Sequence, residues 1–391
     1  MIDSIRSMAQ SLAQETIETR RDFHRHPEIA FEEVRTAKII AERLTKLGLE
    51  PKTGIGKTGV MAILDTGKAG KTVLARADID ALPVQEENEH EYRSTIDGKM
   101  HACGHDGHTA ILLSVAKILV EQKDNFTGKV VFVFQPAEEG AGGAQAMIDD
   151  GALDGLEIDH SIGLHLGSMM PTGAVALRCG PAMASADKFE ITVSGKGGHA
   201  AMPQHSIDPV LISANIIVAL QSLISRELDP TDQAVITVTS IHGGTAFNII
   251  PDSVQLMGTL RTFNEDTRQY LAKRIGELSS GLAASMNGKA KLDFMFGTPT
   301  VINNDKMTKK LRNAFERDLA EGQVIEPPQI MGGDDMAHWL NAADGCYFFV
   351  GSGNEAKGTN YPHHHPKFDV DEDAIPLAVE LFTKGILEFL A

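Results

Sequence analysis

The chain has 391 residues, more than one hydrophobic core usually supports, so two domains are expected. Hydrophobic residues make up 42% of the chain, which is enough for two globular domains. Its formal net charge of −17 comes from Asp and Glu spread along the chain, without a block of Lys or Arg. This charge argues against a nucleic acid or an anionic membrane as partner and favours a small-molecule substrate.

The N-terminal segment has early acidic residues and no apolar core of the kind found in secretion signals. The most apolar helical stretches, 110–120 and 210–224, are short and interrupted by polar residues. The cysteines are odd in number and far apart, unlike a disulfide framework: Cys103, Cys179 and Cys346. We therefore expect a cytoplasmic protein without a signal or a membrane span.

The first half of the chain alternates helical and strand-like patterns. Helical periodicity over residues 4–47 breaks at His26-Pro27, because proline disfavours helix at the preceding residue, so one helix is expected on each side. Then follow strands 60–66 and 72–80, helix 109–122, strand 129–135, a helix near 142–151 and strand 161–167. This alternation predicts a mostly parallel sheet with helices on both faces.

The pattern changes near residue 185. Next come strand 188–195, helix 208–225, strands 234–244 and 253–263, helix 265–287 and strand 289–296. This β-α-β-β-α-β order is typical of a ferredoxin-like unit. Helix 306–320, strand 345–351 and helix 374–390 then resume the first pattern. We expect an α/β domain of residues 1–184 and 297–391, with an inserted α+β domain of residues 185–296.

Side chains able to bind metal gather where predicted strands end, and in open α/β sheets ligands bind at the carboxyl ends of strands. These residues are Asp78, Asp80, Cys103, His105, Asp106, His108, Glu138, Glu139, His165, His363, His364 and His365. Imidazole, thiolate and carboxylate together suit zinc, manganese, cobalt or nickel better than magnesium or calcium. The sequence therefore predicts a transition-metal site.

Spacing narrows the roles. Cys103 and His105 lie two apart in a glycine-bearing turn, where their side chains can converge. Glu138 and Glu139 follow Pro136, and one can bind metal while the other faces an activated water as general base. Taken singly, each residue has a simpler interpretation as a hydrogen-bonded core histidine, a small apolar cysteine or a surface acid. Their convergence favours the metal site.

Nine motifs extend along nearly the whole chain: RRDFHRHPEIAFEE (20–33), ARADIDALP (75–83), MHACGHDGHTA (100–110), QPAEEG (135–140), GLHLG (163–167), SGKGGHAAMP (194–203), FNIIPD (247–252), GTLRTF (258–263) and HHPKFDVDEDAIPL (364–377). Together they resemble the metal-dependent amidohydrolases of peptidase family M20. The resemblance is closest to the branch with N-acyl-amino-acid amidohydrolases, hippurate hydrolases and indole-acetyl-amino-acid hydrolases.

The resemblance implies two divalent cations, manganese, zinc, cobalt or nickel, with Glu138 as general base. The implied ligands are Cys103, His105, Glu139, His165 and His364. It selects His364, two before Pro366, among three consecutive histidines, and it implies that Cys103 bridges the cations. Asp78 is expected to orient a ligand from behind, and Asp106 or His108 to cap the following helix or support a ligand.

For the inserted domain the resemblance implies a lid and dimerisation domain, so a homodimer is expected and a tetramer is compatible. His199 matches a histidine that reaches the partner subunit's site and polarises the scissile carbonyl. Asn248 and Arg261 match positions that bind the substrate's carboxylate. Without the resemblance, Asn248 would be interpreted as a turn residue and Arg261 as a surface residue.

One motif departs from the family pattern. MGGDDMAHW (331–339) stands where relatives commonly have a Gly-Ser or Gly-Glu-Asp-Phe run, so Asp334 is one methylene shorter and Met336 replaces an aromatic residue. We expect this departure to bear on the acyl pocket.

The resulting hypothesis is hydrolysis of an N-acyl amino acid to a carboxylic acid and a free amino acid. A dipeptidase or carboxypeptidase of the same family is the nearest alternative. A cysteine hydrolase with Cys103 as nucleophile would leave Glu138 and the other ligands unused. A non-catalytic metal-containing binding protein would need no base at Glu138.

Overall fold

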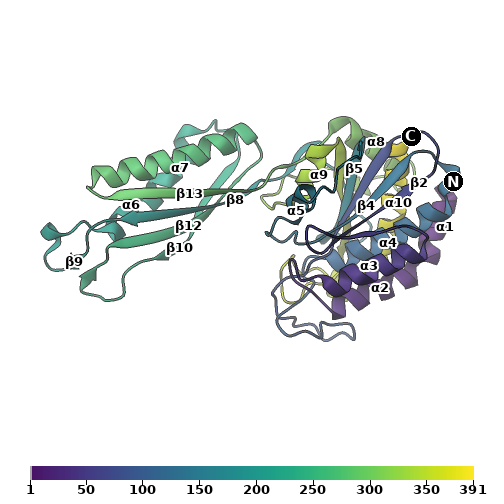
Figure 1. Ribbon diagram of the computed structural model, residues 1–391, viewed down its shortest axis with the longest axis horizontal. Helices are drawn as coiled ribbons and strands as arrows, with labels where there is room; N and C mark the ends of the chain where they lie inside the picture. Colours follow the sequence, from purple (N-terminus) through teal and green to yellow (C-terminus); the bar gives the residue numbers. More distant parts are fainter. Residues whose placement is uncertain (1) are drawn as a thin grey trace. The chain divides into compact units, whose positions relative to one another are not determined.

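The computed structural model describes residues 2–391 and divides the chain into two units (Figure 1). The larger unit contains the chain up to Gly180 together with Ile302–Pro328 and Asp334–Ala391. The smaller unit contains Pro181–Val301 and Gln329–Gly333.

An eight-stranded sheet forms the centre of the larger unit, in the order β1-β2-β4-β3-β5-β16-β6-β15. The strands are β1 (Lys52–Ile55), β2 (Gly59–Asp65), β3 (Thr72–Asp78), β4 (Lys129–Gln135), β5 (His160–Pro171), β6 (Val175–Ala176), β15 (Val324–Ile325) and β16 (Gly345–Gly353). The four central strands run parallel, β4 with β3, β3 with β5 and β5 with β16. The predicted mostly parallel sheet is confirmed, and β4 is almost fully buried, as a strand covered on both faces must be.

The helices of this unit are α1 (Ile2–Ser11), α2 (Ala13–Arg25), α3 (Val34–Lys46), α4 (His105–Glu121), α5 (Gly143–Asp149), α8 (Asp305–Glu316), α9 (Met336–Ala342) and α10 (Ile375–Leu390). Helices α4 and α10 pack together on β3 and β5, with α1 and α2 outside them, while α5 and α9 contact each other beside β4 and β5 (Figure 1). The single helix predicted before His26 was wrong, because the chain breaks into α1 and α2 at Leu12.

Helix α4 begins four residues earlier than predicted. Gly104 precedes it with φ +94°, a left-handed conformation that glycine adopts without strain. The turn that contains Cys103 therefore leads directly into a helix with His105 in its first turn. Residues that the sequence placed in a loop are thus fixed on a rigid element.

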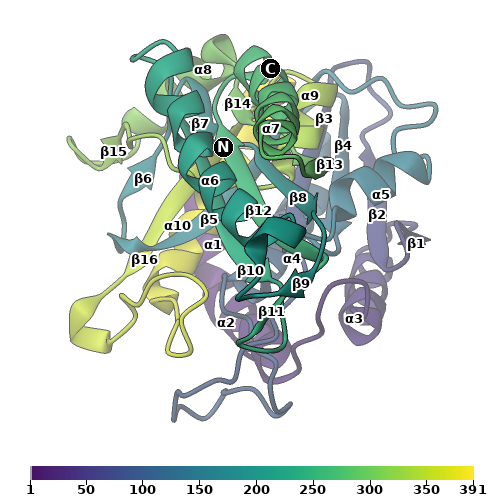
Figure 2. The same ribbon diagram turned by 90° about the vertical axis from the view of Figure 1, so that its left-hand side faces the viewer.

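The smaller unit has a four-stranded antiparallel sheet in the order β10-β12-β8-β13. Its main elements are β8 (Ala186–Ser194), α6 (Pro209–Ser222), a π-helical turn (Leu223–Glu227), β10 (Ala234–His242), β12 (Ser253–Thr262), α7 (Glu265–Ser285) and β13 (Lys289–Thr298). Helices α6 and α7 lie side by side against the sheet (Figure 2). This order and pairing confirm the predicted ferredoxin-like unit.

Short pairings complete the chain: β7 (Gly180–Met183), β9 (Gly198–His199), β11 (Ile249–Ile250) and β14 (Val301–Asn303). Strand β9 pairs with β11. The segment Pro209–Glu227 is long and apolar enough to cross a membrane by composition alone. However, Ile212, Ile216 and Leu220 on its inner face are buried in the core of the smaller unit, as in a core helix of a folded domain.

Candidate metal centre

The predicted ligands of the larger unit meet near the carboxyl ends of β3 and β4 and the start of α4. Four groups at this place have potential ligand atoms within 4.8 Å of one another: Cys103 with His165 and His363, Cys103 with Glu139 and His364, His105 with Glu138 and Glu139, and His105 with His108 and His165. Cys103 belongs to two of these groups. The structure therefore brings all five predicted ligands and Glu138 together.

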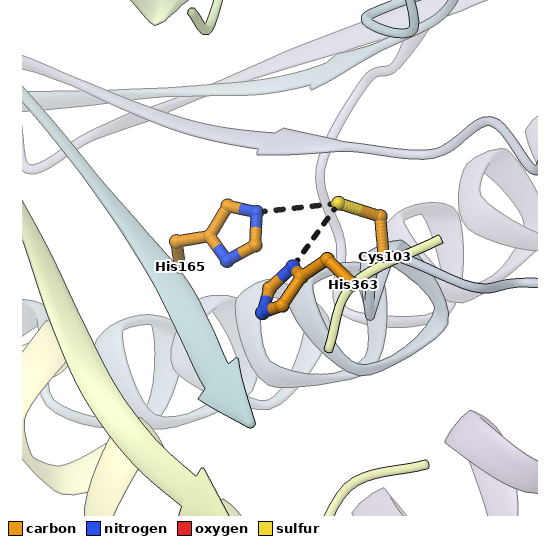
Figure 3. A group of neighbouring side chains, drawn as sticks. All are labelled: Cys103, His165 and His363. Carbon is orange, nitrogen blue, oxygen red and sulfur yellow. Dashed lines mark hydrogen bonds between the residues drawn. The ribbon is translucent and has the colours of Figure 1, made fainter. Parts of the chain in front are cut away.

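Backbone turns direct the neighbouring histidines. The Sγ atom of Cys103 is 3.6 Å from His165 Nε2 and 3.4 Å from His363 Nδ1 (Figure 3). Nε2 of His364 lies 3.3 Å from Glu139 Oε1. His364 has φ +65°, a left-handed conformation rare outside glycine, and its N–H donates to the carbonyl of Ala102 at 2.7 Å. This turn lets adjacent histidines contribute to different groups around Cys103.

Two buried atoms of the predicted ligands make no hydrogen bond among the described residues: His105 Nε2 and Glu139 Oε1, although His364 Nε2 lies 3.3 Å from the latter as an ion-pair contact. They lie 3.9 Å apart. A buried polar atom without a partner costs about 1–3 kcal/mol, so native structures rarely leave one. A cation between these two atoms would satisfy both, and the imidazole, thiolate and carboxylate donors are those of transition metals. The residues present therefore fit a divalent metal.

Asp80 orients two of the proposed ligands. Nδ1 of His105 donates to the backbone carbonyl of Asp80 at 2.9 Å and lies 3.3 Å from its Oδ1. The N–H of Glu139 donates to Oδ2 of Asp80 at 3.1 Å. Sequence reasoning placed Asp80 among the candidates without giving it this role, although it lies two residues after Asp78 at the same strand end. The contact depends on backbone atoms, which spacing does not reveal.

Asp78 has other hydrogen-bond partners. Its Oδ1 accepts from His108 Nδ1 at 2.6 Å and its Oδ2 accepts from Arg76 Nη1 at 2.5 Å. Nε2 of His108 in turn accepts from the N–H of Leu166 at 2.9 Å. Asp78 and His108 thus fasten α4 to the strand that carries His165, and they lie behind the ligand cluster.

Asp106 does not cap α4, whose start has no side-chain cap. Its Oδ2 instead accepts from Arg20 Nε and His24 Nδ1, both at 2.7 Å. These buried cations bind the carboxylate more strongly than backbone N–H groups would, and they fix α2 against α4.

A hydrogen bond to the buried side chain of Glu33 fixes the loop that contains Glu138 and Glu139. Ala137 has φ +53°, and its N–H donates to Oε1 of buried Glu33 at 2.9 Å. Burial and the carboxylates of Asp334 and Asp335 raise the pKa of Glu138. This concentration of acidic groups is a further feature that bound cations would offset.

Comparison with known proteins identifies the family. Residues 74–388 match the description peptidase family M20/M25/M40. Over 381 residues the chain is 39% identical to thermostable carboxypeptidase 1 of Saccharolobus solfataricus, covering 96% of each chain. The chain belongs to this peptidase family. It is accordingly a hydrolase that acts on amide bonds.

Two further proteins that are similar to this chain have names that differ from that of the carboxypeptidase. The chain is 41% identical over 376 residues to IAA-amino acid hydrolase ILR1-like 4 of Arabidopsis thaliana, covering 95% of this chain and 84% of that protein. A solved structure, the Bacillus subtilis YXEP protein, described as a dinuclear metal binding peptidase from the M20 family, superposes with a TM-score of 0.84 at 33% identity. The alignment covers 97% of this chain and 99% of that one.

The two residues at which the 331–339 motif departs from the family pattern, Asp334 and Met336, are buried in this M20 chain. Asp334 accepts from the Tyr347 hydroxyl at 2.6 Å and pairs with Arg76 Nη2 at 3.2 Å. Met336, in α9, is fully buried. The shorter Asp334 thus joins the charge network of Arg76, which sequence reasoning missed because a lone arginine in a strand gives no signal of burial.

The predicted residues of the smaller unit lie at two places. His199 in β9 is exposed, its Nδ1 accepts from the N–H of Ala201 at 3.1 Å, and it pairs with Ile249, the neighbour of exposed Asn248. Ser253, at the start of β12, pairs with Ser194 at the end of β8, just before β9. Arg261 lies at the other end of β12, and its Nε donates to Thr259 Oγ1 at 3.2 Å. The structure brings His199 and Asn248 together and keeps Arg261 apart from them.

Proposed function

We propose that this chain hydrolyses the amide bond of N-acyl amino acids with two divalent cations. The cations are held by Cys103, His105, Glu139, His165 and His364. The observation that carries this proposal is the pair of buried atoms without a hydrogen bond on His105 and Glu139. They lie beside the Cys103 sulfur, which is within 4.8 Å of possible ligand atoms on His165, Glu139 and His364. The names of the plant hydrolase and of the dinuclear Bacillus peptidase support the substrate class and the number of metals.

When bound, the cations would polarise the scissile carbonyl and lower the pKa of a water from 15.7 to about 7. Glu138 lies with Oε2 4.0 Å from His105 Nε2, and its neighbour Glu139 serves as a ligand. Glu138 accepts the proton of the attacking water and delivers it to the leaving amine. Asp80 keeps His105 and Glu139 in position. Cys103 remains a ligand, so no covalent enzyme intermediate forms.

The smaller unit supplies contacts to the substrate. A guanidinium fork suits a carboxylate, so Arg261 and Asn248 bind the carboxylate of the amino acid. His199 donates to the carbonyl oxygen as negative charge develops, a contribution worth about 2.7–4 kcal/mol. Asp78 supports the ligands through His108.

We assign the larger unit as the catalytic domain and the smaller unit as the lid and dimerisation domain. His199 lies on the separate β9-β11 pair that follows the Ser194–Ser253 end of the four-stranded sheet, whereas Arg261 lies near the other end of β12, so a single copy of this unit does not present both to one substrate. A homodimer in which His199 and Asn248 serve the partner's site resolves this, and a tetramer built from such dimers is compatible. We place the enzyme in the cytoplasm.

The proposal is tested by removing metal with a chelator and restoring manganese, zinc, cobalt or nickel one at a time. N-acetyl, N-benzoyl and indole-acetyl amino acids are assayed beside dipeptides. We expect activity on acyl amino acids that disappears with the chelator and returns with metal.

Three results would contradict the proposal. Cleavage of dipeptides alone would indicate a peptidase. Activity that resists the chelator and is abolished by a thiol alkylating agent would indicate a cysteine hydrolase. Metal binding without turnover of any substrate would indicate a binding protein.

A further inference from the structure

His363 lies beside the ligand cluster, although the family pattern selects the next histidine. Its Nδ1 is 3.4 Å from the Sγ of Cys103, and its ring centroid is 5.0 Å from that of His165 and 5.1 Å from that of Phe368 (Figure 3). The ring therefore has a fixed place against the sulfur. Two roles are open to Nδ1 of His363: it can bind a metal through a lone pair, or it can donate a hydrogen bond to the sulfur.

The hydrogen-bond partner of Nε2 determines which of these two roles Nδ1 has. Nε2 of His363 accepts from the backbone N–H of Ser168 at 3.4 Å. A neutral imidazole has one donor and one acceptor nitrogen, and Nε2 is the acceptor here. Nδ1 therefore has the proton and faces the sulfur as a donor. As a metal ligand, Nδ1 would be unprotonated, and the proton on Nε2 would oppose the N–H of Ser168.

Assigning the donor and acceptor nitrogens in the same way shows which neighbouring histidines have a lone pair free to bind a metal. Nδ1 of His165 faces the carbonyl oxygen of Leu166 at 2.8 Å and must donate, which leaves a lone pair on Nε2 toward Cys103. Nδ1 of His105 likewise donates to Asp80, which leaves its unpartnered Nε2 for a metal. His108 donates through Nδ1 and accepts through Nε2, so it has no lone pair left.

We propose that His363 is a positioning residue that donates an N–H···S hydrogen bond to the Cys103 thiolate and is not itself a metal ligand. This inference rests on the proposed function, in which Cys103 binds the cations. A donor to a thiolate withdraws electron density from the sulfur and fixes its direction, as charge-assisted hydrogen bonds do. Groups that support metal ligands in this way typically change metal affinity about 10- to 100-fold.

The test uses the full-length protein loaded with cobalt(II) alone. His363→Leu and His363→Met remove the donor, and His363→Asn restores one, because an amide Nδ2 stands close to the position of Nδ1. His365→Leu is the matched control, since His365 stacks on Tyr361 at 4.7 Å in the same run of histidines. The readouts are cobalt bound per chain, cobalt affinity by chelator competition, and the absorption spectrum.

We expect a thiolate-to-cobalt charge-transfer band in the wild type that moves to longer wavelength in His363→Leu and His363→Met, because the sulfur becomes richer in electrons. Cobalt affinity should fall about 10- to 100-fold in both variants. His363→Asn should return both readouts toward the wild type, and His365→Leu should match it.

An unchanged charge-transfer band in both donor-free variants would overturn the proposal. So would altered cobalt d–d band intensities, which would report a lost metal ligand. A wild type that binds cobalt without any charge-transfer band would overturn this inference and the ligand role of Cys103 together. The expected spectra without hydrolysis of acyl amino acids would support the role of His363 and contradict the proposed function alone.

Discussion

Two aspartates at the end of β3 have different partners although they are only two residues apart. Asp80 contacts the ring of His105 through its backbone carbonyl and its carboxylate and accepts from the N–H of Glu139, whereas Asp78 binds His108 and Arg76. A ligand held by a second hydrogen bond loses less freedom when metal binds. Asp80 is therefore the residue whose removal should loosen two ligands at once.

Asp80→Ala should lower metal affinity about 10- to 100-fold, because Glu139 loses the acceptor of its N–H and His105 keeps the backbone carbonyl of residue 80 but loses the carboxylate 3.3 Å away. Chelator competition on the purified protein measures this change. Asp97→Ala, at an exposed turn, is the matched control and should bind metal as the wild type does. Wild-type affinity in Asp80→Ala would show that the ligands are held without this carboxylate.

For single residues, the sequence predicts which side chains come together at the site but not which of their atoms donate or accept hydrogen bonds. Cys103, His105, Glu139, His165 and His364 follow from motifs, and the structure brings them together. The donor role of His363 depends on the backbone N–H of Ser168, which no spacing rule reveals. Hydrogen-bond partners across the chain thus decide what the composition of a motif leaves open.

Helices α2 and α4 are joined by a buried charge pair. Arg20 and His24 on α2 both contact Asp106 on α4, and His24 Nε2 also lies 3.2 Å from Glu86. Burial and Arg20 lower the pKa of His24, but Asp106 and Glu86 outweigh them and raise it to about 9. His90 and the carboxylate of Asp369 are close to the same cluster.

This charge pair predicts a pH-dependent stability. The unfolded pKa of histidine is about 6.5 and the folded value is raised, so the contribution is fully present below pH 6.5 and is lost as pH rises through about 9. Urea unfolding at pH 6.5 and 9.5 should show the wild type losing about 1–3 kcal/mol more than His24→Gln. His26→Gln, which keeps this pair, should follow the wild type, and an equal pH dependence in His24→Gln would disprove the linkage.

Long periodic elements were predictable and short ones were not. The ferredoxin-like order and strand 129–135 follow from apolar patterns and are confirmed. Two-residue strands such as β6 and β9 give no periodic signal, because their pairing depends on distant partners. The early start of α4 depends on the backbone of Gly104, which a hydrophobic pattern does not report.

For the whole molecule, the smaller unit exposes apolar side chains that suit contact with a second copy. Val218 on α6 is 75% exposed, and Ile241 on the edge strand β10 is 58% exposed. An unpaired strand edge and an apolar helix face are surfaces that proteins commonly cover. They support the proposed homodimer.

Val218→Glu should convert a dimer to monomers, because a charge would be buried at the interface. Sedimentation velocity measures the mass, and turnover should fall with it as His199 and Asn248 leave the partner's site. Lys273→Glu, at an exposed position of α7, is the control and should stay dimeric. A monomeric Val218→Glu with full turnover would contradict the shared site.

The most direct test of the account is a paired measurement on Glu138→Gln, of metal bound per chain and of turnover on an N-acyl amino acid. Glu138 is assigned as the base and not as a ligand, so the variant should keep two metal ions and lose about 10²- to 10⁴-fold in rate. Undiminished turnover, or loss of metal together with activity, would contradict the assignment of Glu138 as the general base.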